Sequence, residues 1–348
     1  MDGVGDHARL LAAALAEAGH DSRLVTIDWR SHGWWELLKK VRSVHSMRPD
    51  LVVLHYSHLG WSRRGLPFGL LLVVALSRAV GPVLLWVHDP GGVRGFRLRQ
   101  VLGGIAKNWG LRSAVRIAGQ AIVTVDPAVL PWLDGASCSV QFCPSPTNMA
   151  SVPRQPPTDF FTVTCFGIAL TTDAPTMRIL EPTCVGLARV IGPFRLQILG
   201  ANEPLSSELR DRLSAAGVIV DLPGAMSADD LGHALARSHV YWHAKGRLTT
   251  RSGTLSAALA CGLPVVGMLG DETATPLDRG RVVVIGDLDV EGLISAIADL
   301  SSDPDRQQVL SAKSAFTSDE FYSWSRSRDA VLAVLESNDR RSRAATRR

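Results

Sequence analysis

The chain has 348 residues, of which 46% are hydrophobic and 20% charged, and its formal net charge is +4. This balance excludes general disorder and predicts a globular protein with a large core, most simply in two domains. The five cysteines lie too far apart for a zinc site or a disulfide scaffold, so we expect buried, reduced thiols and a cytoplasmic protein.

The chain opens with a glycine loop that leads into a helix. Gly3 and Gly5 precede an apolar-periodic run that ends at Gly19, and residues 23–27 are predicted to form a strand. A glycine loop before a helix is a standard anion site, because unpaired N–H groups and the helix dipole face the ligand. Such a loop normally follows a strand, so either the true start lies upstream or the sheet lacks a strand. Residues 1–20 also lack the basic start and unbroken apolar run of a signal peptide.

The first half continues as alternating strands and helices. An apolar stretch at residues 66–87 is interrupted by Arg78 and Gly81 before it reaches the roughly 20 residues of a membrane span, so we interpret it as a buried helix and a buried strand. Strands alternating with helices of this length predict a parallel sheet covered on both faces. The strands are expected at residues 51–56, 83–87, 121–125 and 139–142, and the helices at residues 33–47, 66–79 and 95–117.

A proline-rich segment separates this domain from a second one. We expect an N-terminal domain at residues 1–143, a linker at residues 144–159 and a C-terminal domain at residues 160–317. The strand and helix pattern begins again after the linker. The predicted fold class is therefore α/β, with two doubly wound parallel sheets and a ligand cleft between their carboxyl ends. A helix at residues 318–338 is expected to pack back, and the basic residues 339–348 form a disordered tail or contact a membrane surface.

Three segments resemble the GT-B glycosyltransferases of the large retaining family 4. They are "DGVGDHARLLAAALAEAGH", "VIVDLPGAMSADDLGHALARSHVYWHA" and "ALACGLPVVG". The resemblance spans residues 1–335 and implies two Rossmann-like domains, an N-terminal one for the acceptor and a C-terminal one for the nucleotide-sugar. In that family the glycine loop follows the first strand, so this chain is expected to lack that strand and to start too late.

The resemblance also implies a reaction. A hexose would pass from a nucleotide-sugar donor to a glycan or lipid-linked acceptor, in glycan or cell-envelope assembly. Retention without a protein nucleophile is implied, with the donor's own phosphate oxygen accepting the acceptor's proton on the same face. Neither a metal nor a cofactor is expected, since the nucleotide-sugar is a substrate.

The stretch "KGRLTTRSGTLSAALACG" is the candidate site for the donor diphosphate. A helix predicted to run to Cys261 starts there, so its first N–H groups and hydroxyls would meet the phosphates. The alternative is an ordinary N-capped helix with solvated basic side chains. The candidates are Lys245, Arg247, Arg251, Ser252, Gly253 and Thr254 for the diphosphate and, in a later loop, Asp271, Glu272 and Thr273 for the donor sugar.

The same stretch departs from the family pattern. The family's two glutamates, eight positions apart, fall on Thr249 and Ala257, and alanine cannot hold the ribose hydroxyls. The run "TRSGTLSAALACG" resembles a variant in which an arginine-bearing loop replaces the first glutamate, which favours an active but atypical enzyme. The alternative is a non-catalytic GT-B homologue that binds a sugar nucleotide or a partner protein. Donor hydrolysis distinguishes the two.

Histidines gather near the strand ends of the N-terminal domain. His88 and Asp89 follow a predicted strand in "WVHDPGG", where the family often has a histidine, and they are the candidate catalytic residues that would orient a hydroxyl; a structural histidine is the alternative. His55 and His58 lie at the exit of the preceding strand, but no spacing is that of metal ligands, so no metal site is expected. The residues around the glycine loop that are expected to reach the same cleft are Gly3, Gly5, Asp6 and His7.

The segment at residues 94–116 carries cations and no acid. We interpret it as a surface helix with a core face; the alternative is an interfacial helix on an anionic membrane, at the inner, cytoplasmic side. Its basic residues are Arg94, Arg97, Arg99, Lys107, Arg112 and Arg116. Nucleic-acid binding is not expected, because base-stacking aromatics on a recognisable module are missing. A nicotinamide dehydrogenase is disfavoured, because no GxGxxG follows a strand.

Overall fold

The computed structural model divides the chain into two units, residues 1–144 with 324–348 and residues 145–323. The segment predicted as a linker therefore belongs, from Ser145 onward, to the second unit. The structure describes residues 3–26, 29–57, 68–90, 98–135, 137–149, 151–157, 159–168, 176–200, 205–273, 275–277, 280–286 and 289–346.

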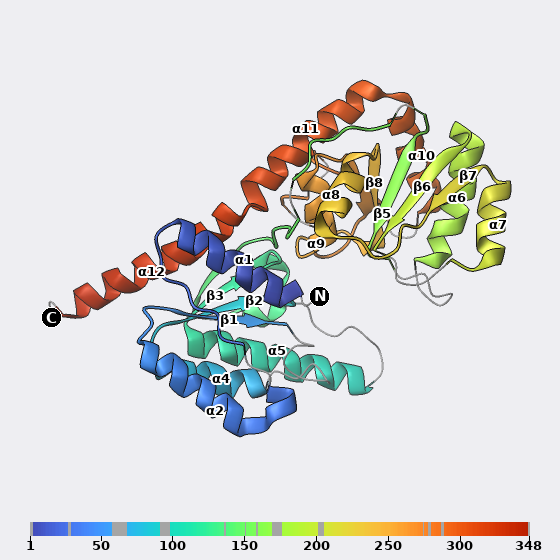
Figure 1. Ribbon diagram of the computed structural model, residues 1–348. Coiled ribbons are helices and arrows are strands. Elements are labelled where there is room, and N and C mark those ends of the chain that lie inside the picture. The colour runs from blue at the N-terminus through green and yellow to red at the C-terminus, as the bar shows by residue number, and fades with distance from the viewer. Residues whose placement is uncertain are drawn as a thin grey trace. The chain divides into compact units, whose positions relative to one another are not determined.

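The first unit is built on a four-stranded parallel sheet in the order β1-β2-β3-β4. Two helices, α4 (Phe68–Arg78) and α5 (Leu98–Ala118), pack on one face, and α2 (Trp29–Met47) lies against α4 (Figure 1). The other face carries α1 (Gly3–Glu17) and α12 (Trp324–Thr346). The strands are β1 (Val52–Tyr56), β2 (Val83–Val87), β3 (Gln120–Val123) and β4 (Ser139–Phe142).

Hydrophobic patterning explains why helices cover both faces of this sheet. All five residues of β2 are buried, as is typical of a parallel strand with a helix layer on each side. Successive side chains of a strand point to opposite faces. Leu85 accordingly joins the core formed with α4 and α5, whereas Leu84 and Trp86 join the core formed with α1 and α12.

The structure corrects two expectations for this unit. Residues 23–26 form no strand, and Leu24 is half exposed. An extended segment becomes a strand only where a neighbour pairs with its backbone, and the described sheet ends at β1. The expected disordered tail is also wrong as far as Thr346, because α12 continues as a helix through residues 339–346, where arginine and alanine favour helix.

The second unit is built on a six-stranded parallel sheet in the order β10-β9-β8-β5-β6-β7. Its strands are β5 (Thr162–Phe166), β6 (Phe194–Leu199), β7 (Val218–Asp221), β8 (Val240–Arg247), β9 (Val265–Met268) and β10 (Val283–Ile285). Its helices are α6 (Met177–Ile191), α7 (Ser207–Ala215), α8 (Ala228–Ala236), α9 (Gly253–Ala260), α10 (Val290–Ser302) and α11 (Pro304–Phe321).

Two hydrophobic cores hold the helices of this unit to the sheet. One core contains residues of α6, α7 and α10, and the other contains residues of α8 and α9. The helices α6 and α10 approach closely at Gly186, where an added Cβ would overlap the Ile294 side chain. Helices on both faces of a parallel sheet confirm the predicted doubly wound α/β fold class.

The strand order locates a binding region in the second unit. The chain starts in the middle of the sheet at β5, moves outward through β6 and β7, and then crosses to β8 on the other side of β5. Open α/β sheets bind ligands at such a switch point, outside the carboxyl ends of the two central strands. The expected ligand-binding region is therefore where β5 and β8 end.

Among the described helices, none combines the length and the apolar content needed to cross a bilayer.

Candidate functional site

The loop after β8 turns into α9 at the switch point of the second unit. Ser252 is the N-cap of α9, and its Oγ accepts a hydrogen bond from the backbone N–H of Leu255 at 3.4 Å. The same Oγ lies 3.1 Å from Thr254 Oγ1, which also accepts a hydrogen bond from the Tyr241 hydroxyl at 3.2 Å. A Cβ on Gly167, just after β5, would lie 3.2 Å from Thr254 Cγ2, so the first turn of α9 packs against the exit of β5.

None of the described residues blocks the space in front of this helix end. Gly253 is exposed, and a Cβ added there would meet none of the described atoms within 4 Å. Because the first N–H groups of a helix have no partner within the helix and carry its positive dipole end, they favour an anion at this position. The structure thus confirms the predicted helix start, with Ser252 as N-cap and Gly253 and Thr254 in the first turn of α9.

The predicted cations lie before α9, Lys245 and Arg247 at the end of β8 and Arg251 on the loop that follows, and two of them have acidic partners. Arg251 Nε donates to Glu272 Oε2 at 2.9 Å, and Arg247 lies 3.9 Å from Asp271. Lys245 retains solvent contact, while desolvation and the nearby charge of Arg251 lower the pKa of its ammonium. Lys245, Arg247 and Arg251 are all exposed to solvent near the start of α9.

The loop predicted to contact a donor sugar also braces the loop before α9. Thr249 Oγ1 donates to Glu272 Oε2 at 2.7 Å. Thr273 Oγ1 donates to the Leu248 carbonyl at 2.8 Å and accepts from the Gly270 N–H at 2.9 Å. Sequence analysis missed this carboxylate beside Thr249, because no local pattern links two loops that are 23 residues apart. Ala257, the other position that departs from the glutamate pattern, lies in α9, and its side chain is buried with 1% exposed.

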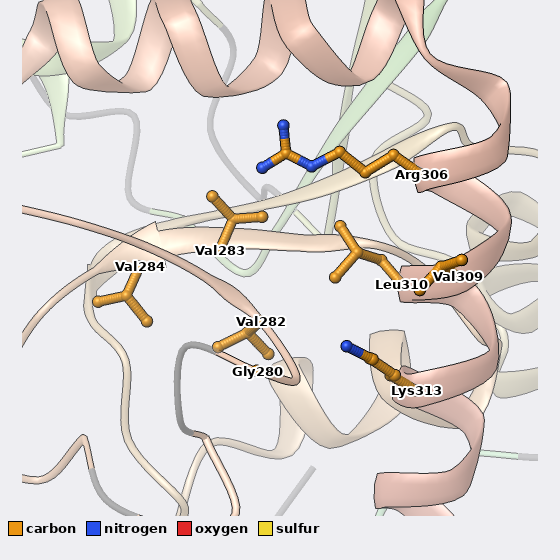
Figure 2. A pocket seen from close by; sticks show the side chains of 8 residues that line it. All are labelled: Gly280, Val282, Val283, Val284, Arg306, Val309, Leu310 and Lys313. Carbon is orange, nitrogen blue, oxygen red and sulfur yellow. The ribbon is translucent and has the colours of Figure 1, made fainter.

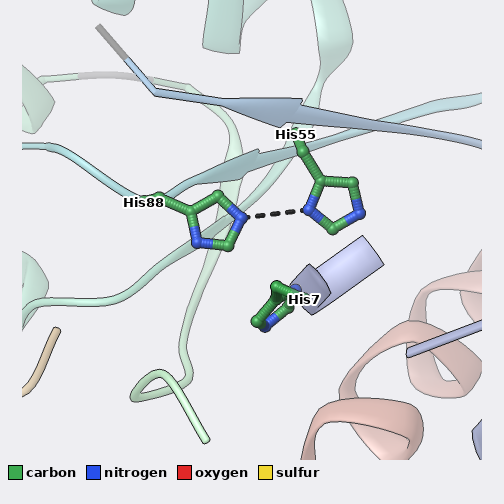
Figure 3. A group of neighbouring side chains, drawn as sticks. All are labelled: His7, His55 and His88. Atoms are coloured by element: carbon green, nitrogen blue, oxygen red, sulfur yellow. Dashed lines mark hydrogen bonds between the residues drawn. The ribbon is translucent and has the colours of Figure 1, made fainter. Parts of the chain in front are cut away.

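Three histidines from different elements meet in the first unit. His7 lies in α1, His55 in β1, and His88 directly after β2. His55 Nδ1 lies 3.0 Å from His88 Nε2, and the ring of His7 stands 4.6 Å from that of His88 and 5.4 Å from that of His55 (Figure 3). One ring nitrogen of each histidine lies within 4.8 Å of the others. The spacing of these histidines in the sequence does not reveal the group, because three separate elements supply them; His58, the histidine nearest to His55 in the sequence, lies outside the described residues.

The backbone fixes the position of His88. Its N–H donates to the Tyr56 carbonyl at 2.9 Å, which continues the β1–β2 ladder, and its carbonyl accepts from Thr124 Oγ1 at 3.0 Å. The next loop is held by Trp132, whose Nε1 donates to the Pro90 carbonyl at 2.9 Å. Asp89 sits between these two anchors, and its charge acts on the neighbouring His88 and Tyr56 side chains.

Burial keeps all three imidazoles neutral near pH 7. Desolvation, with a repulsive contribution from the neighbouring histidines, lowers the pKa of His7 well below its usual value and that of His55 to about 3. Desolvation lowers the pKa of His88 to about 4, and the negative charge of Asp89 opposes that shift. A neutral imidazole has one nitrogen with a free lone pair, so the group offers acceptors or metal ligands.

The glycine loop predicted at the N-terminus is a helix in the structure. Gly3 and Gly5 belong to the first turn and a half of α1, so the predicted loop is corrected. Asp6, in the same turn, forms an ion pair with Arg9. Only His7 of this predicted set reaches the histidine group.

The predicted basic helix exposes apolar side chains as well as cations: Arg116 is exposed and Arg112 partly exposed. In α5, Leu102, Ile105 and Trp109 are each more than half exposed, whereas Lys107 is buried. Arg94 and Arg97 lie outside the described residues, and the side chain of Arg99 is not described either. Leu102, Ile105 and Trp109 therefore form an exposed apolar stripe at helical spacing on α5.

A surface pocket of about 370 Å³ lies elsewhere in the second unit, between β10 and α11 (Figure 2). Its walls are mostly apolar, and none of its residues belongs to the predicted sites. They are Gly280, Val282, Val283, Val284, Arg306, Val309, Leu310 and Lys313.

Several solved structures share this architecture. Sucrose-phosphate synthase from Thermosynechococcus elongatus aligns with 16% identity over 97% of this chain and 92% of that one, with a TM-score of 0.62. A glycosyltransferase from Rickettsia africae aligns with 11% identity over 97% and 95% of the two chains, with a TM-score of 0.68. HepE of Anabaena, in complex with UDP, aligns with 14% identity over 87% and 82%, with a TM-score of 0.62.

No known family model matches the chain, and no curated protein matches its sequence. At 11–16% identity the structural likenesses establish the fold: the chain has the GT-B fold, as its sequence predicted.

Proposed function

We propose that this protein is a glycosyltransferase that moves a hexose from a nucleoside-diphosphate sugar to a glycan or lipid-linked acceptor. One observation carries the proposal: the open N-terminus of α9, with its two hydroxyls and exposed cations, lies at the switch point of the Rossmann-like sheet. The GT-B fold supports it, as do the UDP bound to the Anabaena protein HepE and the UDP and GlcNAc bound to a pneumococcal O-GlcNAc transferase of similar structure.

The proposed donor site needs no metal at the diphosphate. The N–H groups of Gly253 and Thr254 and the Ser252 hydroxyl would bind phosphate oxygens, and Lys245 and Arg247 would supply positive charge. These groups act more strongly as charge grows on the departing diphosphate, which is how they would lower the barrier. Asp271 is exposed beside them and is the proposed contact for a donor-sugar hydroxyl.

The proposed acceptor residues lie in the first unit. Asp89, placed by the anchored loop after β2, would orient the acceptor hydroxyl together with His88. The acceptor's proton would then pass to the departing phosphate oxygen on the same face of the sugar, which gives retention. This route needs no protein nucleophile.

The test compares two matched N-caps. Ser252 caps α9 and Ser227 caps α8 in the same way, each accepting from a backbone N–H three residues on. We expect both Ser→Ala variants to lose about 1 kcal/mol of stability. Only Ser252→Ala should weaken donor binding, by roughly tenfold, or about 1.4 kcal/mol.

Calorimetric titration of the full chain with UDP, GDP, ADP and dTDP sugars measures the affinity, and product analysis with the donor that binds measures hydrolysis and transfer. Equal loss of affinity in both variants, or no binding of any nucleotide by the folded protein, would contradict the proposal.

A second candidate is a non-catalytic GT-B homologue that binds a sugar nucleotide or a partner protein. Ala257 favours it, because a buried alanine stands where a ribose-binding carboxylate would be expected. Binding of a nucleotide-sugar without hydrolysis or transfer, in the presence of glycan and lipid-linked acceptors, would support this second candidate over the first.

We further propose that the protein binds its acceptor at the inner face of an anionic membrane, and that α5 contacts the lipid surface. The exposed stripe of Leu102, Ile105 and Trp109 would insert its apolar side chains at the lipid interface. Glutamate at all three positions should abolish sedimentation with anionic vesicles. Val190→Glu is the control, because Val190 is an equally exposed residue on α6. Unchanged sedimentation of the triple variant would exclude this contact.

A further inference from the structure

We propose that His7, His55 and His88 form a binding site for one divalent transition metal ion, with zinc the best chemical match. The site lies entirely in the first unit, and the α9 site for the donor belongs to the second. The proposal stands on the histidine geometry and does not rest on the proposed transferase activity.

The spacing of the ring nitrogens suits a single ion. Zinc binds imidazole nitrogen at about 2.0–2.1 Å, so two nitrogens at a tetrahedral angle lie about 3.4 Å apart. His55 Nδ1 and His88 Nε2 are 3.0 Å apart, and the three candidate ligand atoms lie within 4.8 Å of one another. Small side-chain rotations would bring all three to ligand distance. Figure 3 shows the His7 ring beside the other two rings.

His7 provides an independent observation. Its side chain is 6% exposed, and neither ring nitrogen has a hydrogen-bond partner among the described residues. Leaving a buried polar group unpaired destabilises the folded state, so such groups call for an explanation. The His7 ring packs against the rings of Trp86 and Trp324, with centroid distances of 4.8 and 4.9 Å. These contacts restrict the orientation of the His7 ring beside the other two histidines. A shared ion would bind one of the two His7 nitrogens that lack a hydrogen-bond partner.

The surroundings favour a cation of intermediate softness. Three imidazoles without a carboxylate are a poor set for magnesium or calcium, which prefer oxygen, and a good set for zinc, cobalt or nickel. The negative charge of Asp89, next to His88, favours a nearby cation.

Regular secondary structure also holds the three proposed ligands in place. They come from α1, β1 and the exit of β2, and the last two are joined by the β1–β2 ladder, which pairs His55 with Trp86. Three protein ligands leave one tetrahedral position for water or an oxygen of a bound molecule. With the ion in place, His88 would be a ligand and Asp89 would remain as the residue that orients an acceptor hydroxyl.

The experiment uses the full chain, stripped of metal with a chelator and titrated with Zn²⁺ against a chromophoric competitor. We expect one Zn²⁺ per chain. His7→Leu, His55→Gln and His88→Gln should each weaken binding by more than about 100-fold, because even an outer-shell partner costs about 10- to 100-fold. His7→Leu should fold, since it replaces an unpaired buried group by an apolar one. His239→Gln is the control, because this partly buried histidine lies in the second unit.

A second measurement needs no variant. X-ray absorption at the zinc edge of the wild-type complex should show scattering from three imidazole rings. A folded wild-type chain that binds neither Zn²⁺ nor Co²⁺ would overturn the proposal, as would equal affinity in the wild type and all three variants. Neither readout involves a nucleotide-sugar, so failure here and failure of the proposed transferase function are distinguishable.

Discussion

Glu272 Oε2 accepts a hydrogen bond from Thr249 Oγ1 at 2.7 Å, and this contact joins the loop after β9 to the loop before α9. The same oxygen accepts from Arg251 Nε at 2.9 Å. A carboxylate thus lies beside Thr249 and contacts its hydroxyl. The contact also keeps Arg251 aligned with the start of α9.

Removing this carboxylate should loosen the loop before α9. We expect Glu272→Ala to lower the free energy of unfolding by about 1 kcal/mol, because Glu272 is largely buried while Arg251 remains partly solvated. Asp271→Asn is the control, since its contact with Arg247 is long and exposed, and it should leave stability unchanged. Urea unfolding of both variants measures the difference. Equal effects would mean that the Glu272 contacts do not hold the loop.

Gly253 allows a test in which stability and binding change in opposite directions. Gly253→Ala should raise the free energy of unfolding by about 0.5 kcal/mol, because alanine lowers the conformational entropy of the unfolded chain. In the folded protein its Cβ would meet none of the described atoms within 4 Å. It should weaken donor binding, since the methyl group narrows the approach to the backbone. Gly103→Ala in α5, also in open space, should stabilise without changing donor affinity. Thermal unfolding and donor titration test both, and unchanged donor affinity in Gly253→Ala would place the phosphates elsewhere.

His243 should make the protein less stable in acid. It is 2% exposed in β8, and desolvation, with the charge of Lys245, lowers its pKa to about 4, compared with about 6.5 in the unfolded chain. Between these values the unfolded chain binds more protons, so the free energy of unfolding falls as the pH drops from 6.5 toward 4.

Replacing this histidine should reduce the acid sensitivity. The difference in unfolding free energy between pH 7 and pH 5 should shrink by about 1–2 kcal/mol in His243→Gln, measured in urea with a chelator present. His233→Gln, at an exposed position of α8, is the control and should keep the full difference. An unchanged difference in His243→Gln would mean that this histidine is protonated in the folded state.

Gly186 should be required for the close packing of α6 on α10. Gly186→Ala should cost about 1–3 kcal/mol, because its Cβ would overlap Ile294. Ile294→Val alone should cost about 0.5–1.5 kcal/mol. The double variant should be less destabilised than the sum, since valine lacks the overlapping Cδ1. Additive costs, measured by urea unfolding, would show that the helices adjust without this contact.

Local patterns in the sequence were enough for most elements and for the fold. Apolar runs such as residues 83–87 and 162–166 are strands because both faces are covered, and this is visible in composition alone. Failures occurred where a neighbour decides the outcome. Residues 23–26 have strand-forming side chains but no described partner strand. Gly3 and Gly5 form the start of α1, whereas the sequence pattern predicted a loop there.

The sequence by itself determined the α/β periodicity and the N-cap at Ser252, because both depend on neighbours a few positions away. Only the tertiary structure decided which distant side chains meet. His7, His55 and His88 converge because α1 packs on the sheet where β1 and β2 end, and Glu272 reaches Thr249 because two loops leave adjacent strands. Register and packing set such contacts, and no local spacing encodes them.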